Sequence, residues 1–99
     1  MYDWDERKRR ANIQKHRVDF ALVVEIFEGD YVEIQDIHGP FKEPRYRALG
    51  TFEGQTYVVV YTWREETRRI ISAWRVGERG KRRYQALFAR RSSRNAGEG

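Results

Sequence analysis

One short stretch near the start of the chain, residues 4–20, holds more polar and charged side chains than a first helix needs for packing. His16 carries an imidazole, which can give or take a proton near neutral pH. Lys8, Asn12 and Lys15 are spaced by four and three residues, so they share one face of a helix with His16 beside it. The pattern fits a site that binds an anion and moves a proton. Taken alone, it fits a solvated helix face that ends in a histidine even better.

The charge of the chain is polarised along the sequence. The net charge is +5, and residues 75–94 contain eight Lys or Arg against Glu78 alone. Residues 25–43 instead hold six acids against one cation, Lys42. A basic cluster attracts phosphates, although a solvated helix and a basic tail would have the same composition.

Composition excludes several classes of site. The chain has no cysteine, which rules out disulfides and thiolate metal sites and fits a reducing cytoplasm, where we expect the protein to act. The two histidines are 22 residues apart without paired carboxylates, so we expect no metal and no cofactor. No stretch is apolar enough to span a membrane, and the charged start of the chain does not resemble a signal peptide.

The pattern of apolar residues predicts one small α+β domain over residues 1–91 and a flexible basic, glycine-containing tail over 92–99. Asp5 and Asp19 are suitable N-caps for two helices, at about 5–16 and 20–28. Phe20, Val23, Val24 and Phe27 form an apolar stripe that must pack on one sheet face, which leaves the other face free for function or a partner.

A short strand at 2–4 precedes these helices, and a meander of strands at 45–52, 55–63 and 68–76 follows them. A helix at about 78–91 ends the domain. Residues 32–35 alternate in polarity, as a short strand or a loop entry does, and residues 38–44 read as a loop. The expected order is β-α-α-β-β-β-α around an antiparallel sheet.

Further candidates lie on the expected strands. Arg45, Arg69 and Arg75 stand near strand ends, where they could fix phosphates bidentately or pair with surface acids. The aromatic residues of 57–63 could stack bases, but such residues are more often core.

Two sets of residues together resemble the BrnT toxins of bacterial type II toxin–antitoxin systems, which are small ribonucleases with a RelE-like fold. The first set keeps every spacing of an N-terminal motif: Trp4, Asp5, Lys8, Asn12, Lys15, His16, Val18 and Phe20. The second set lies on the meander and the last helix: residues 43–50, 58–62 and 69–73, and Tyr84. The resemblance covers residues 2–88. Three positions depart from the family pattern: Arg17 replaces the usual Gly, Trp74 the usual Arg, and Gly80 the usual Glu.

The resemblance implies a metal-independent endoribonuclease, in which the RNA 2′-hydroxyl attacks the adjacent phosphate and leaves a cyclic phosphate. His16 would transfer protons, and the other expected catalytic residues are Lys15, Arg75 and Tyr84. The expected substrate-binding residues are Lys8, Asn12, Arg45, Arg69 and Trp74. Because the departures remove an Arg and a Glu that such chemistry could use, the alternative is a non-catalytic nucleic-acid-binding or corepressor relative with impaired cleavage. A small metal-dependent hydrolase is disfavoured by the ligand count.

The resemblance also implies partners. These are a BrnA-type ribbon-helix-helix antitoxin that covers the active face, and operator DNA bound only through that antitoxin. The family is also associated with toxin homodimers.

Overall fold

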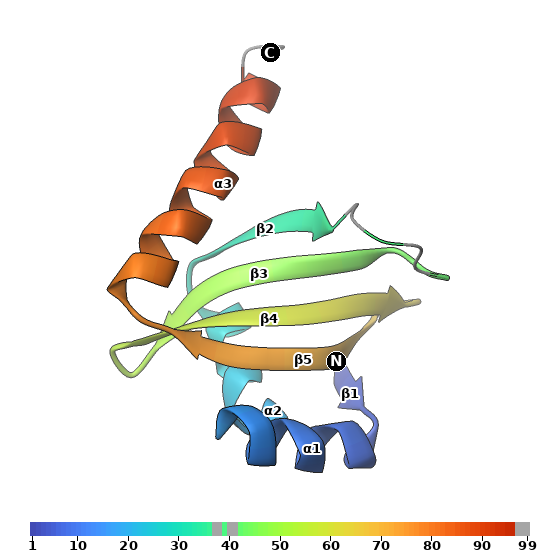
Figure 1. The fold of residues 1–99 in the computed structure, drawn as a ribbon. Coiled ribbons are helices and arrows are strands. Elements are labelled where there is room, and N and C mark those ends of the chain that lie inside the picture. Colours follow the sequence, from blue (N-terminus) through green and yellow to red (C-terminus); the bar gives the residue numbers. More distant parts are fainter. Residues whose placement is uncertain (37–38, 40–41, 97–99) are drawn as a thin grey trace.

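The computed structural model describes residues 1–36, 39 and 42–96, with residues 91–96 as backbone only. The α+β class is confirmed: one five-stranded sheet in the order β1-β5-β4-β3-β2 has helices on both sides (Figure 1). The strands are β1 (Tyr2–Trp4), β2 (Tyr31–Asp36), β3 (Arg45–Phe52), β4 (Gln55–Arg64) and β5 (Thr67–Val76).

The prediction of an antiparallel sheet is wrong at one edge, because β1 pairs with β5 in parallel. Tight turns join β3 to β4 and β4 to β5, and such turns require antiparallel pairing. No turn joins β1 to β5, which are far apart in the sequence, so their relative direction is free. The sheet is therefore mixed.

The expected element order also lacked a strand. Residues 31–36 form β2, which pairs antiparallel with β3 from Tyr31 opposite Gly50 to Asp36 opposite Arg45. The alternation of polarity there indicates a strand with one face buried, and only Ile34 among its residues is fully buried. The RelE-like fold stays a prediction. Part of the expected loop at 38–44 lies outside the described residues, namely residues 38, 40 and 41, and residue 37 before it lies outside them too.

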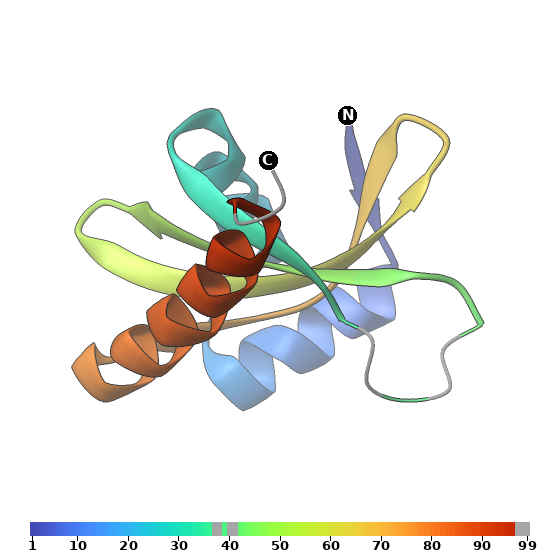
Figure 2. The ribbon, with the colours of Figure 1, turned by 90° about the horizontal axis from the view of Figure 1, so that it is seen from above.

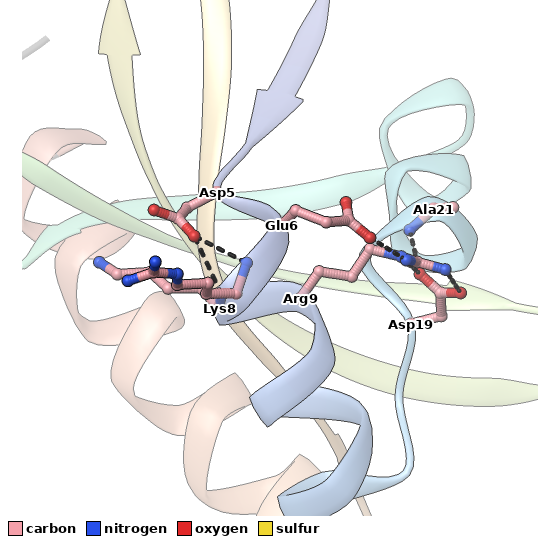
Figure 3. A network of polar contacts seen from close by, with 7 residues as sticks. Asp5, Glu6, Lys8, Arg9, Asp19 and Ala21 are labelled. Carbon is pink, nitrogen blue, oxygen red and sulfur yellow. Dashed lines mark hydrogen bonds and ion pairs between the residues drawn. The ribbon is translucent and has the colours of Figure 1, made fainter.

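Both N-terminal caps form as expected (Figure 3). Helix α1 (Glu6–His16) begins where Asp5 accepts hydrogen bonds from the backbone N–H groups of Arg7 and Lys8, at 2.8 and 3.3 Å. These N–H groups, that of Lys8 first, lower the pKa of the Asp5 carboxyl. Asp19 likewise accepts from Ala21 N–H at 3.0 Å and starts α2 (Phe20–Val23).

The second helix changes type part-way, because α2 continues as a 3₁₀-helix, η1 (Val24–Glu28), which ends at Gly29. Its apolar stripe packs on the sheet as predicted, and Phe20, Val23 and Phe27 are buried. The contact is close: a Cβ on Gly50 of β3 would lie 2.8 Å from Cβ of Ile26. Glycine is therefore required at position 50.

Helix α3 (Glu78–Ala96) lies on the opposite side of the sheet and passes over β2 (Figure 2). Tyr84, Leu87 and Phe88 pack there against Leu49, Val58 and Trp74, so the face expected to be free is partly covered. The helix continues beyond its predicted end at residue 91, and residues 97–99 of the predicted tail lie outside the described residues. None of the described helices is long and apolar enough to cross a membrane.

Candidate active site

Helix α1 is fastened to the sheet by the side chain of Asn12. Strand β1 pairs only with residues 68–70 of β5, so beyond them none of the described strands pairs with this edge of β5. There the Asn12 amide takes the place of a strand: its Nδ2 donates to Ala73 O at 2.8 Å, and its Oδ1 accepts from Ala73 N at 3.1 Å. Nδ2 also donates to Val18 O at 2.9 Å. Asn12 is 6% exposed, and it fixes where the end of α1 lies.

The end of α1 carries His16 to the side chain of Trp74 on β5. The two ring centroids are 6.0 Å apart and the rings are tilted by 39°. On its side of the sheet, Trp74 also contacts Arg47 of β3, whose guanidinium carbon lies 5.7 Å from the indole centroid. An imidazole and a guanidinium thus both lie next to one indole ring.

Two further groups hold the Arg47 guanidinium in place. Its Nε donates to the Asp36 carboxylate at 3.1 Å, and its Nη1 donates to the Tyr84 hydroxyl at 2.8 Å. Asp36 is nearly buried, whereas a third of the Arg47 side chain is exposed. Because a guanidinium has five N–H donors in a planar fork, donors remain with which Arg47 could bind a phosphate.

His16, Trp74 and Tyr84 are the sequence-predicted residues that the structure brings together, and Arg47 joins them. Lys15 precedes His16 and is exposed. Arg45 is two residues before Arg47 on β3, and alternate residues of a strand share a face. The imidazole of His16 and the guanidinium of Arg47 therefore lie at Trp74, and Lys15 and Arg45 are neighbours of these two residues on α1 and β3.

Four other predicted residues lie elsewhere or are already engaged. Arg75 follows Trp74 on β5 and is paired opposite Tyr57, so it points to the other face of the sheet. Arg69 forms an ion pair with Asp3 at 2.7 Å near the start of α1, and Lys8 is about 12 Å along α1 from His16. Asn12 is buried with its amide fully hydrogen-bonded.

Sequence reasoning missed Arg47 and Asp36. The signal was present, because Arg47 alternates along β3 with Leu49, which is buried under α3. A partly buried arginine beside a buried leucine needs hydrogen-bonding partners, and Asp36 lies on the neighbouring strand β2.

Two departures from the family pattern have local structural consequences. Arg17 ends α1 with φ 59° and ψ 32°, the left-handed conformation in which glycine is unstrained. Gly80 lies in the first turn of α3, and a Cβ there would lie 3.2 Å from Cβ of Val76. Arg17 therefore strains the backbone beside His16. At position 80, Val76 leaves little room for a side chain.

Within the described part of the chain, no group of three or more His, Asp or Glu side chains is arranged to hold a metal ion. The groups gathered at this site are an imidazole, a guanidinium, a phenol and an indole.

A comparison with known families identifies the chain. A family model described as the ribonuclease toxin BrnT of type II toxin–antitoxin systems matches residues 4–80. The chain belongs to the BrnT toxin family. It is therefore a type II toxin, and a toxin of this kind has an antitoxin partner. The matched region of this BrnT toxin includes His16, Arg47 and Trp74 but ends before Tyr84. A search of curated proteins finds no match.

Proposed function

We propose that this BrnT toxin is an endoribonuclease that cleaves RNA with His16 and Arg47, with no metal ion in the chemical step. The observation that supports the proposal is the position of both side chains on Trp74, at 6.0 and 5.7 Å from its ring. Cleavage of a phosphodiester needs a group that moves protons and a cation that stabilises the phosphorane, and these two residues supply both.

In the proposed reaction the RNA 2′-oxygen attacks the adjacent phosphorus, and the bond from phosphorus to the 5′-oxygen breaks. His16 takes the proton of the 2′-hydroxyl, and the leaving 5′-oxygen takes a proton from the Tyr84 hydroxyl or from water. The products are a 2′,3′-cyclic phosphate and a 5′-hydroxyl. Arg47 donates to the nonbridging oxygens, whose charge grows in the transition state.

The residues around this pair would bind the RNA chain. Lys15 and Arg45 add positive charge beside His16 and Arg47. The half-exposed Trp74 indole offers a flat surface on which a base can stack. In this scheme Asn12 positions α1 and contacts no substrate, and Arg75, Lys8 and Arg69 contribute only long-range charge.

The test compares RNA cleavage by the purified protein and by single variants. We expect His16→Ala and Arg47→Ala each to lower the rate by roughly 10²–10³-fold. Arg64→Ala is the matched control, because Arg64 is exposed and pairs with Glu43 near the end of β4. The fragments should have cyclic phosphate and 5′-hydroxyl ends, and a chelator should leave the rate unchanged. Undiminished cleavage by either site variant would refute the proposed chemistry.

The alternative is a toxin relative that binds nucleic acid or acts as a corepressor without cleaving. Trp74 favours it, since an indole occupies the position of the usual arginine. The alternative predicts that the protein binds RNA with an affinity that falls steeply as the salt concentration rises, and that it does not cleave the RNA. Strong activation by Trp74→Arg would indicate that the parent is a weakened enzyme.

The partner proposals follow from the resemblance to BrnT toxins. The antitoxin would be a BrnA-type ribbon-helix-helix protein that acts in the cytoplasm and contributes the contact with operator DNA. A toxin homodimer is also proposed.

A further inference from the structure

Strand β2 forms an edge of the sheet, and none of the described strands pairs with its outer side. The N–H and C=O groups on such an edge are available to another extended chain. Val32, near the start of β2, is 46% exposed and leaves apolar surface beside this edge. The edge is therefore open at an apolar position.

A groove of about 340 Å³ runs beside this edge, between β2, β3 and α3. Its apolar wall includes Val32, Leu49 and Phe88, and polar side chains such as Lys81 and Gln85 line the rest. Since α3 passes over β2 (Figure 2), the groove lies on the α3 side of the sheet. A strand added to β2 would direct every second side chain toward that side.

Charge determines which chain fits the edge. Glu28 and Asp30 precede β2 and are exposed, and Glu33 lies in β2 with 35% of its side chain exposed. Pairing of β2 with a second copy of itself would bring these acids close together, which opposes self-association. A basic segment would instead be attracted to them.

Glu33 adds a specific reason to expect a cation. Its carboxylate has Arg68 as its ion-pair partner at 4.0 Å, the limit of such a contact. Burial raises the pKa of Glu33, and Arg68 offsets this only in part. A cation supplied by a partner beside β2 would compensate this carboxylate.

We propose that the outer edge of β2 around Val32 and the adjoining groove bind an extended segment of the antitoxin in which apolar and basic residues alternate. The apolar side chains enter the groove, and the basic ones lie near Glu33. Phe88 lies one helical turn beyond Tyr84, so this segment contacts the helix that holds the Tyr84 hydroxyl on Arg47. The inference rests on the toxin–antitoxin relationship and not on the cleavage chemistry.

Hydrogen exchange of the backbone amides tests the mode of binding, with the toxin alone and with the antitoxin of the same operon. We expect slower exchange in residues 31–34 of the complex. Unchanged exchange in a complex that forms would overturn the proposal, and so would failure of the two proteins to bind. Slow exchange in a toxin dimer without antitoxin would identify a second copy as the occupant and would also overturn it.

Two variants test the surface itself. Val32→Lys places a polar, cationic side chain on the edge, and we expect antitoxin affinity to fall by about tenfold or more. Leu22→Lys is the control, because Leu22 is 39% exposed on α2, away from the groove. Both variants should keep the parent melting temperature. Equal affinities for the two variants would overturn the proposal, whereas loss of RNA cleavage with normal antitoxin binding would refute only the chemistry.

Discussion

The Arg47 guanidinium donates a hydrogen bond of 2.8 Å to the Tyr84 hydroxyl, which joins the middle of the sheet to the last helix. The same guanidinium donates to Asp36 at 3.1 Å and lies over Trp74. Residues of three other elements, β2, β5 and α3, thus restrain one partly exposed cation. Such restraint limits the motion of a group that must meet a developing charge.

The Tyr84→Phe variant tests both roles given to this hydroxyl, which are the restraint of Arg47 and the donation of a proton to the leaving 5′-oxygen. It removes the hydroxyl and keeps the ring, so the guanidinium loses one of its partners. We expect RNA cleavage to fall about tenfold, and Arg47→Lys, which loses the planar fork, to lower it further. Tyr46→Phe is the control, because Tyr46 is also half-buried but stacks on Tyr61 on the other sheet face. Equal rates for the two tyrosine variants would contradict a role for the bond.

The Asn12→Ala variant tests the structural role of the amide. It leaves Ala73 N–H, Ala73 C=O and Val18 C=O without their partner. Each buried group left unsatisfied costs roughly 1–3 kcal/mol, so we expect the free energy of unfolding to fall by at least about 2 kcal/mol. Chemical denaturation measures the loss. Full stability with impaired RNA binding would instead support the predicted substrate role.

Local signals explain which parts of the fold were predictable. Asp5 and Asp19 each accept N–H groups two residues on, and the turns of the meander lie between strands that are neighbours in the chain. The pairing of β1 with β5 joins residues more than sixty positions apart, and nothing near Tyr2 or Arg68 indicates it. Strand β2 was left out of the expected order because five of its six residues remain partly exposed.

The site was partly predictable for a related reason. The resemblance to BrnT toxins singled out His16, Trp74 and Tyr84, which do converge. Arg47 was missed because its importance comes from Asp36 and Tyr84, which reach it through strand pairing and through α3. Strand alternation alone could have separated Arg75 from Trp74.

The Arg17→Gly variant tests the strain at the end of α1. The left-handed backbone of Arg17 costs about 1–2 kcal/mol, and the greater freedom of glycine in the unfolded chain offsets part of the relief. We expect the free energy of unfolding to rise by about 0.5–1 kcal/mol, as measured by urea denaturation. Arg10→Gly is the control, because position 10 lies inside α1, where glycine destabilises by about 1 kcal/mol. A less stable Arg17→Gly protein would contradict the argument.

The Glu33→Gln variant gives a prediction with a defined pH dependence. Burial raises the folded-state pKa of Glu33 above its unfolded value, so ionised Glu33 opposes folding at neutral pH. We expect the variant to be more stable than the parent at pH 7. As the pH falls through the folded-state pKa, the parent takes up the proton and the difference shrinks, and it should vanish below roughly pH 4.

Asp19→Asn is the control for this pH dependence, because the pKa of Asp19 is shifted in the opposite direction to that of Glu33. Arg9 donates to the Asp19 carboxylate at 2.8 and 3.0 Å (Figure 3), and these hydrogen bonds lower the pKa of Asp19. The ionised Asp19 therefore stabilises the fold above its unfolded pKa, and this contribution is lost as the pH falls through the folded-state pKa. We expect Asp19→Asn to melt at a lower temperature than the parent at pH 7, by a margin that narrows in acid. Parallel pH profiles for the two variants would contradict both assignments, since the causes of the two pKa shifts are opposite.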